Sequence, residues 1–239
     1  MRIGFVINDM FNETEPSTTL RLAMTAQNRG HEVWLIGVGD FAYDPDEQVH
    51  AHARKAPGET YETPTAYYAD LCSKNGIAKR ITVDDLDILM LRNDPSADID
   101  RPWAQHSAIV FGRKAMRHGV VVLNDPDGLA KAVNKMYFQS FPEIVRAKTL
   151  ITRNSNDIKN FYEACDKKII IKPLMGSGGH NVFLVDSGSA GNMNQIIESV
   201  FRDGYAIVQE FLPEAAKGDT RLFLMNGDPL VYQGKIAAF

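Results

Sequence analysis

A glycine-rich segment that follows a strand-like run is the feature of this sequence best suited to chemistry. Residues 169–171 are isoleucines, Lys172 follows them, and the segment closes with Gly176, Ser177, Gly178 and Gly179. Glycines leave backbone N–H groups free to point together at an anion, and a lysine supplies positive charge for phosphate oxygens. The segment predicts a phosphate-binding loop, although a simple hairpin turn fits the same residues.

The order of these residues excludes two common nucleotide motifs. A P-loop has its lysine after the glycines and begins a helix, whereas Lys172 precedes the glycines. A dinucleotide-binding fingerprint also leads into a helix, whereas residues 181–185, NVFLV, are strand-like. The segment is therefore expected to be a glycine loop between two strands.

Two further groups of residues could serve the same site. Lys135 follows a turn and begins a short helical run, while Gln209 and Glu210 end an apolar strand that leads to Phe211 and Leu212. This set of residues, in this order, resembles the ATP-grasp superfamily, and the resemblance implies that the backbone of Phe211 and Leu212 pairs with the edge of an adenine while the Glu210 carboxylate accepts from its amino group. For Lys135 the alternative is a solvated lysine at a helix end.

Length and composition limit the class of protein. The chain has 239 residues, 44% hydrophobic and 23% charged, which suffices for more than one globular domain. Its net charge of −4 leaves no excess of Lys and Arg for a phosphate backbone, so no nucleic-acid partner is expected. Cys72 and Cys165 are too few for a disulfide framework, and no apolar stretch suits a signal peptide or a membrane span. We expect a cytoplasmic protein without a membrane partner.

Alternating strand-like and helix-like segments predict an α/β fold. In the first half, strands are expected at residues 2–7, 32–38, 85–92 and 120–124, and helices at about 17–30 and 104–118. Such alternation is typical of βαβ units in a mainly parallel, Rossmann-like sheet. Residues 39–84 show no regular pattern.

The turn-rich residues 124–128, NDPDG, predict a border between the first domain and a second one. Beyond it, strands are expected at residues 149–152, 167–174, 181–185 and 205–213, helices at 155–164 and 196–201, and two extended runs at 221–227 and 229–239. The last run ends at Phe239 within a strand-like pattern. This favours a truncated domain over a domain border that falls there by chance.

The combined segments resemble the ATP-grasp superfamily and, within it, the bacterial glutathione synthetases. Six segments match that family in order: residues 90–96, 121–129, 134–138, 169–179, 209–214 and 218–230. The resemblance covers essentially the whole chain. It implies a pre-ATP-grasp α/β domain on the substrate side (residues 1–124), an ATP-grasp lid subdomain (125–204) and the start of an incomplete C-terminal ATP-grasp subdomain (205–239).

The resemblance also implies a reaction. In this family ATP phosphorylates the carboxylate of γ-glutamylcysteine, and glycine attacks the acyl phosphate to give glutathione, ADP and phosphate. Another carboxylate–amine ligase of the superfamily, such as a peptide glutamate ligase, and a truncated non-catalytic nucleotide-binding protein are the alternatives. Family members form homo-oligomers, so a homo-oligomer is expected here as well.

The site residues are carried over from the matching segments. The resemblance assigns the nucleotide to Lys135, Lys172, Gly176, Ser177, Gly178, Gly179, Gln209, Glu210, Phe211 and Leu212. It assigns γ-glutamylcysteine to Arg92, Asn93, Asp94, Asp219 and Arg221, with Arg221 as the catalytic residue near the reacting carboxyl. A simple Asp94–Pro95 turn and an outward-facing Arg221 paired with Asp219 remain as alternatives.

Magnesium, or manganese, is the cofactor that the resemblance implies. The family's metal ligands lie on strands beyond the segment that contains Arg221, so no ligand is expected before Phe239, and this fragment alone is expected to be inactive. His50 and His52 would project from one face of a strand. Without a third ligand, that pair predicts no metal site.

Overall fold

The computed structural model describes residues 1–13, 17–98, 100–176 and 178–238. Their contacts group into two compact units, residues 1–142 with 174–180 and residues 143–173 with 181–239. Each unit has its own sheet and its own hydrophobic core. Each is therefore described by itself.

Six α-helices and fourteen strands are found in the described residues. The helices are α1 (Thr18–Asn28), α2 (Pro64–Cys72), α3 (Ala104–Arg117), α4 (Pro126–Lys131), α5 (Ser155–Ala164) and α6 (Met193–Arg202). The strands are β1 (Arg2–Ile7), β2 (Glu32–Tyr43), β3 (Val49–Lys55), β4 (Ile77–Thr82), β5 (Ile88–Leu91), β6 (Val121–Leu123), β7 (Thr149–Thr152), β8 (Ile169–Pro173), β9 (Phe183–Val185), β10 (Ala206–Glu210), β11 (Leu224–Met225), β12 (Asp228–Pro229), β13 (Val231–Tyr232) and β14 (Lys235–Ile236). None of the helices in the described residues combines the length and the apolar character needed to cross a bilayer.

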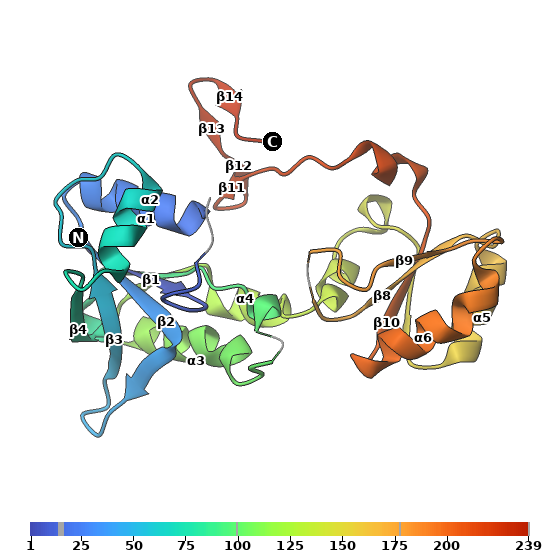
Figure 1. The fold of residues 1–239 in the computed structure, drawn as a ribbon, viewed down its shortest axis with the longest axis horizontal. Coiled ribbons are helices and arrows are strands. Elements are labelled where there is room, and N and C mark those ends of the chain that lie inside the picture. The colour runs from blue at the N-terminus through green and yellow to red at the C-terminus, as the bar shows by residue number, and fades with distance from the viewer. Residues whose placement is uncertain (14–16, 99, 177, 239) are drawn as a thin grey trace. The chain divides into compact units, whose positions relative to one another are not determined.

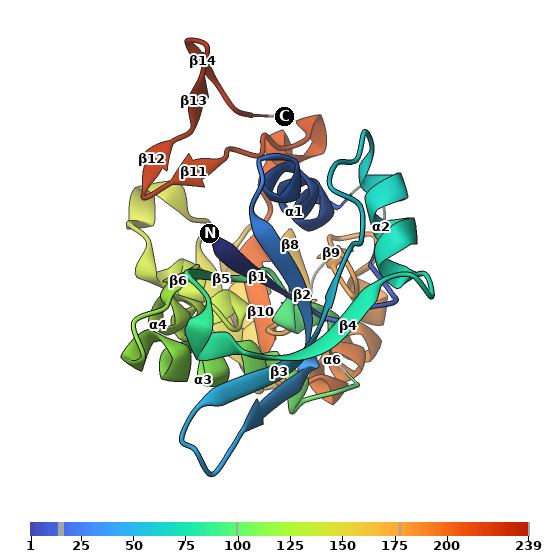
Figure 2. The same ribbon diagram turned by 90° about the vertical axis from the view of Figure 1, so that its left-hand side faces the viewer.

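A six-stranded sheet in the order β4-β3-β2-β1-β5-β6 forms the first unit (Figure 2). β1 pairs in parallel with β2 and β5, and β5 pairs in parallel with β6. β3 and β4 extend the sheet from β2 by antiparallel pairing. The predicted Rossmann-like sheet is confirmed for four strands, and the antiparallel extension comes from residues 39–84, whose sequence shows no regular pattern.

Helices cover both faces of this sheet, with α1 and α2 on one side and α3 on the other (Figure 2). Successive residues of a strand point to opposite faces. Phe5 of β1 packs with Leu20 of α1 and Tyr67 of α2, whereas its neighbour Val6 belongs to the core that includes Ala108 of α3. A strand buried on both faces needs an apolar residue at nearly every position, which explains the uninterrupted run at residues 3–7.

Two boundaries in the first unit differ from those predicted. The strand predicted at residues 32–38 continues to Tyr43, because β3 pairs with the added residues beyond a register shift. The turn predicted at residues 124–128 is wrong, because this segment begins α4. The Asp125 side chain caps the helix and Pro126 occupies its first turn, a position where its missing N–H costs nothing.

The second unit is built on a four-stranded antiparallel sheet in the order β7-β10-β8-β9, with α5 and α6 on one face (Figure 1). Its core takes Ile171 from β8, Val208 from β10, Tyr162 from α5 and Ile197 from α6, each at most 5% exposed. The predicted border between residues 204 and 205 falls inside this unit, since β10 pairs with both β7 and β8.

Only short elements follow β10. β11 pairs with β12 and β13 pairs with β14, each as a two-residue ladder, where longer extended runs were predicted. Backbone hydrogen bonds from Phe223 N to Ala237 O (3.0 Å) and from Ala237 N to Leu230 O (2.8 Å) join the two hairpins. The predicted extended backbone is thus present, but in hairpins rather than in long strands.

Replacing Leu20 by alanine tests the packing of α1. Leu20 is 0% exposed, whereas Leu22 on the same helix is 40% exposed. Leu20→Ala is expected to lower the free energy of unfolding by about 2–5 kcal/mol through lost burial and the cavity left behind. Leu22→Ala should cost less than about 1 kcal/mol. Urea unfolding followed by the fluorescence of Trp34, which is 4% exposed, measures both variants; equal losses would contradict the assigned buried face.

Candidate functional site

A cavity of about 390 Å³ in the first unit brings together residues from three predicted groups. Asp94 comes from the loop after β5, Lys135 follows α4, and Gly176 belongs to the glycine loop. Ser96 and Asn134 add polar side chains to the lining, and aromatic side chains of the 3-10 helix Lys135–Ser140 add apolar surface. A cavity of this size, with few polar groups on an apolar lining, is typical of a small-molecule site.

Lys135 is fixed to the beginning of the glycine loop. Its backbone N–H donates to Leu174 O at 3.2 Å, and its Nζ donates to Met175 O at 2.9 Å. The Asn134 side chain caps the 3-10 helix that Lys135 begins, by accepting from Met136 N at 2.9 Å. Lys135 is therefore half-buried beside the loop rather than a solvated lysine at a helix end.

The glycine loop adopts a backbone conformation that is unfavourable for residues with a side chain. Gly176, Gly178 and Gly179 have φ angles of +93°, +65° and +77°, a region that L side chains rarely adopt. A Cβ at Gly176 or Gly179 would meet no atom within 4 Å, so the space over the loop is open. Without side chains, backbone N–H groups at these glycines can be approached closely by an anion. Ser177 lies outside the described residues.

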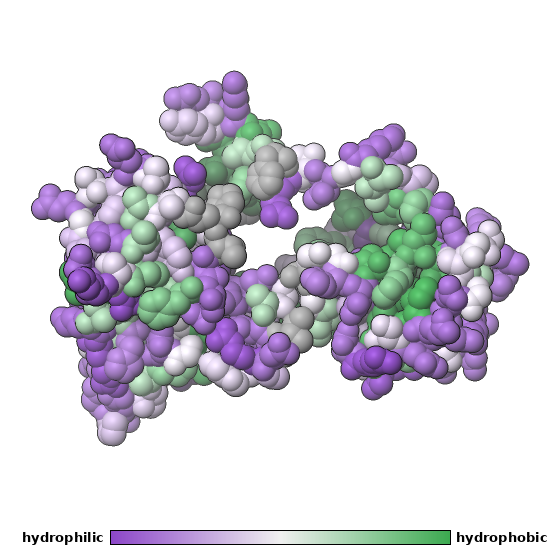
Figure 3. Space-filling model, viewed as in Figure 1, coloured by the Kyte–Doolittle hydropathy of each residue, from purple (hydrophilic) through white to green (hydrophobic). Residues whose placement is uncertain are grey.

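In the second unit, the pleat of the sheet puts Lys172 and Gln209 on one face. Ile171 of β8 points to the core under α5 and α6, so Ile170 and Lys172 point to the opposite face. On β10, Ile207 lies directly opposite Lys172 and Gln209 lies opposite Ile170. Figure 3 shows a hydrophobic area over this sheet. On this face Ile170, Lys172 and Gln209 are half-buried, and Ile207 is 2% exposed.

Burial lowers the pKa of Lys172, because desolvation disfavours its charged form. A phosphate placed against the ammonium group would replace the solvation that the folded chain has removed. The position of Lys172 thus disfavours a charge in the free protein and favours an anionic ligand.

The segment predicted to hold adenine leaves this sheet at the end of β10. Gln209 Nε2 donates to Thr149 Oγ1 at 2.9 Å, and Glu210 Oε1 accepts from Lys148 N at 2.7 Å. The Lys168 ammonium lies 4.0 Å from the centre of the Phe211 ring. One Glu210 oxygen is therefore engaged with the backbone of the neighbouring strand, while Leu212 remains 48% exposed.

Three of the five residues predicted to bind γ-glutamylcysteine follow β5 at the carboxyl edge of the parallel strands. Arg92 Nε donates to Thr19 Oγ1 at 3.3 Å, and Asn93 is half-buried. Asp94 caps a 3-10 helix over Pro95–Ala97, as its Oδ1 accepts from Ser96 N at 2.9 Å. Asp94 therefore makes the simple turn that was its alternative, and it also lines the cavity.

A partly buried carboxyl lies near Arg92. The pKa of Glu13 is raised by burial, against the lowering effects of a hydrogen bond from Ser17 and the charge of Arg92. Ser17 also caps α1, which carries Thr19. The carboxyl edge therefore presents both signs of charge, as a zwitterionic amino-acid group would need.

The residues that hold this edge together were missed by the sequence analysis. Asn8 bonds reciprocally with the backbone of Asp94, and its side chain also contacts Asp98, which is 3% exposed and paired with Arg101. Asn8 stands where the first apolar run ends. A polar residue directly after a parallel strand is a signal that could have identified it.

Asp219 and Arg221 lie in the second unit, in an exposed segment between the 3-10 helix Pro213–Lys217 and β11. Lys135 and Asp94 belong to the first unit. The roles of Asp219 and Arg221 therefore remain predictions from the resemblance.

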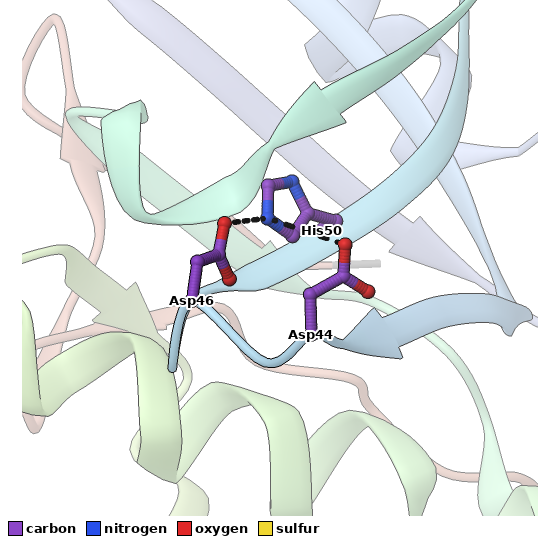
Figure 4. Close-up of side chains that lie close together, drawn as sticks. All are labelled: Asp44, Asp46 and His50. Carbon is purple, nitrogen blue, oxygen red and sulfur yellow. Dashed lines mark hydrogen bonds and ion pairs between the residues drawn. The ribbon is translucent and has the colours of Figure 1, made fainter.

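A cluster of Asp44, Asp46 and His50 lies at the hairpin between β2 and β3 (Figure 4). His50 Nε2 is 2.9 Å from Asp46 Oδ2 and 3.7 Å from Asp44 Oδ2, so the two aspartates supply carboxylates that the sequence pair of histidines lacked. Arg80 NH2, however, donates to both oxygens of Asp44 at 2.7 and 2.8 Å. This guanidinium occupies the carboxylate that a cation would need, so we describe the cluster as an ion-pair network.

Two family models match the chain. The prokaryotic glutathione synthetase N-terminal domain matches residues 1–130, and the prokaryotic glutathione synthetase ATP-grasp domain matches residues 134–237. The chain belongs to the prokaryotic glutathione synthetase family. The predicted family is confirmed, and with it the class of ATP-dependent carboxylate–amine ligases.

Relatives of known name agree with this family. The glutathione synthetases of Vibrio cholerae, Synechococcus elongatus and Escherichia coli K12 are 28%, 29% and 27% identical to this chain. The matches cover 97%, 96% and 97% of this chain and 69%, 70% and 70% of those proteins.

Solved structures share the fold. A RimK domain ATP-grasp protein from Sphaerobacter thermophilus has a TM-score of 0.55 at 18% identity, and covers 93% of this chain and 68% of its own. D-alanyl-alanine synthetase A from Vibrio cholerae has a TM-score of 0.56 at 12% identity, and covers 99% of this chain and 64% of its own. At these identities the likeness concerns the fold alone, and it confirms the predicted α/β ATP-grasp fold.

Replacing Lys172 by methionine tests the desolvated lysine. Its pKa is lowered by folding, so the free energy of unfolding is reduced while the lysine is charged in both states, and it recovers as the pH rises through the folded pKa. Lys172→Met should therefore raise the midpoint of thermal unfolding at pH 7. Lys159→Met, on the exposed side of α5, should leave it unchanged. A lower midpoint for Lys172→Met would contradict the argument.

Proposed function

We propose that this protein joins γ-glutamylcysteine to glycine with consumption of ATP, and that the cavity around Asp94, Lys135 and Gly176 is part of its active site. The observation that supports this most is the bond from Lys135 Nζ to Met175 O, which places the lysine beside a loop of glycines with positive φ. Lys135 and Gly176 line the same cavity as Asp94, the last residue of the segment predicted to bind the substrate. The family assignment supplies the class of reaction.

We propose that Lys135, Lys172 and the loop residues 176–179 bind the phosphates of ATP. The two ammonium groups offset the charge of the phosphate oxygens, and backbone N–H groups of the loop add donors. Gln209 and Glu210 then direct the linker, and the backbone of Phe211 and Leu212 pairs with the adenine. The ion-to-ring contact from Lys168 to Phe211 stabilises the start of that linker.

Substrate binding is proposed at the carboxyl edge, where Arg92 and Asn93 follow β5 and Asp94 closes the loop. Asp219 and Arg221 complete the site in this proposal, with Arg221 near the reacting carboxyl. A guanidinium suits that role because it makes two parallel hydrogen bonds to a carboxylate or a phosphoryl group. Catalysis by such residues consists of positioning and charge compensation rather than nucleophilic attack by a side chain.

Magnesium, or manganese, is proposed as the metal that accompanies ATP, where it would neutralise phosphate charge. The donors described at the cavity fit phosphate better than a metal, because Lys135 and the glycine N–H groups are cationic or proton-donating. We also propose that residues 1–124 form the substrate-side domain, that residues 125–204 form the ATP-grasp lid subdomain and residues 205–239 the start of the C-terminal ATP-grasp subdomain, and that the protein works as a cytoplasmic homo-oligomer.

Release of ADP tests the proposed reaction. The complete gene product, with MgATP, γ-glutamylcysteine and glycine, should release ADP only when all three are present. Lys135→Ala should raise the KM for ATP at least about tenfold, because the loss of a charge-assisted bond to phosphate costs about 1.5–3 kcal/mol. Lys159→Ala, an exposed lysine of α5, is the control. Release that is independent of γ-glutamylcysteine would exclude this substrate, and release with glutamate in place of glycine would support a different ligase.

Arg221 is tested separately, because its proposed role concerns the reacting carboxyl. Arg221→Ala should lower kcat by about 10²–10³-fold, the cost of removing one donor that stabilises developing charge. The KM for ATP should change little. Lys217→Ala removes an exposed cation that pairs with Glu214 in the same segment and should leave kcat unchanged. A kcat for Arg221→Ala within threefold of wild type would remove Arg221 from the catalytic residues.

A further inference from the structure

The loop after β5 is tied to the end of β1 by one side chain. Asn8 Nδ2 donates to Asp94 O at 2.7 Å, and Asn8 Oδ1 accepts from Asp94 N at 2.7 Å. The amide of Asn8 thus imitates a strand neighbour and continues the pairing of β1 with β5 beyond Arg92 N, which donates to Val6 O at 3.0 Å. The backbone at Asp94 is held at two points by a residue 86 positions away.

Asn8 is held in turn by a buried carboxylate. Asp98 is 3% exposed, and its Oδ2 accepts from Asn8 Nδ2 at 2.7 Å. Its Oδ1 accepts from Arg101 Nε at 3.0 Å, and Arg101 NH2 reaches Asn8 O at 3.2 Å. The backbone carbonyl of Asp98 accepts from Gln105 Nε2 at 3.2 Å, which connects the group to α3. Asn8, Asp98 and Arg101 therefore form a closed triangle of hydrogen bonds, which we call the Asp98 triangle.

The Asp98 triangle is a costly way to hold a loop together. A buried carboxylate loses several kcal/mol of hydration, and ion pairs of this kind are often no more stabilising than well-packed apolar residues. Hydrogen bonds, unlike apolar contacts, are directional, so a hydrogen-bonded amide and a guanidinium group fix the backbone at defined points. The position of this loop matters because Asp94, Pro95 and Ser96 line the cavity that Lys135 also lines.

The position of Arg92 depends on the same hydrogen bonds. Its backbone is bonded to Val6, and its side chain reaches Thr19 of α1 at 3.3 Å. Only Asn93 lies between Arg92 and Asp94, whose backbone is held by Asn8. A loop that shifted by about 1 Å would move Arg92 and the cavity wall together, which is enough to weaken a positioned contact.

We infer that Asn8, Asp98 and Arg101 are positioning residues, which set the loop from Arg92 to Ser96 so that it binds the amino-acid substrate of the ligase. The inference rests on the proposed function, since it takes this loop as the binding element for γ-glutamylcysteine. The Asp98 triangle acts through Arg92 and the Asp94 backbone rather than by contact with the substrate.

The test compares the KM for γ-glutamylcysteine with the KM for ATP in variants of the complete gene product. Asp98→Asn keeps the side-chain volume but removes the charge that holds Arg101. It should raise the KM for γ-glutamylcysteine at least tenfold while the KM for ATP stays within twofold. Asn8→Ala should do the same, and Arg101→Lys should recover part of what Arg101→Ala loses. A purely structural role would lower the amount of active enzyme, and so kcat, without separating the two KM values.

Asp127→Asn is the matched control, because Asp127 is an exposed aspartate whose carboxylate pairs with Arg113 at 2.6 Å. It should leave both KM values unchanged. Hydrogen exchange at the amide of Asp94 gives a second measure that needs no turnover: it should accelerate at least tenfold in Asn8→Ala and Asp98→Asn relative to Asp127→Asn.

The outcomes separate the inference from the function on which it rests. If wild type releases no ADP that depends on γ-glutamylcysteine, the proposed function fails and the inference fails with it. If wild type is active but the KM for γ-glutamylcysteine in Asp98→Asn equals that of wild type, the inference alone is overturned. Unchanged exchange at the Asp94 amide in folded Asn8→Ala would overturn it as well.

Discussion

The parallel pairing of β1 with β5 is the constraint on which the candidate site depends. Its register sets Val6 opposite Leu91, so both strands end at the same edge and the chain leaves them side by side. Only then can the amide of Asn8 meet the backbone of Asp94. A slip of one residue would turn alternate side chains to the other face of the sheet and separate Arg92 from Thr19. The apolar cores on the two faces of the sheet oppose that slip, because Phe5 belongs to one core and Val6 to the other.

The second sheet uses the same two-residue period for a different purpose. Ile171 faces the core under α5 and α6, and Lys172 faces away from it, so one strand both stabilises its unit and presents a cation. The core position fixes the lysine more firmly than a loop would. This placement also explains why burial lowers the pKa of Lys172: its neighbours on that face are Ile170 of the same strand and Ile207 opposite.

Most elements could be predicted from the sequence because their signals are local. The strand at residues 2–7 and the helix that Ser17 caps are examples, since apolar spacing and caps lie within a few residues of each other. β3 could not be predicted, because its sequence, VHAHARK, has only Val49 and two small alanines as apolar residues, and the strand is defined by its pairing with β2 and β4. At residues 124–128, a proline and an aspartate suit a turn and a helix start equally, and packing decides: Pro126 lies against α3 near Gly112.

The candidate site divides in the same way. Lys135, Lys172 and the glycines are recognisable because each belongs to a short motif, whereas Asn8, Asp98 and Arg101 have meaning only through contacts that span up to 93 residues. The place of Asn8 directly after a strand could have pointed to it, but no pattern in a single sequence reports its partners before the fold is known. Asp98 and Lys172 nevertheless have one property in common. Each is a charged group that the fold buries, and an unpaired buried charge would destabilise the folded state. For Asp98 the chain itself provides the partner, and the result is a fixed loop. For Lys172 burial lowers the pKa, and an anionic ligand would compensate its charge.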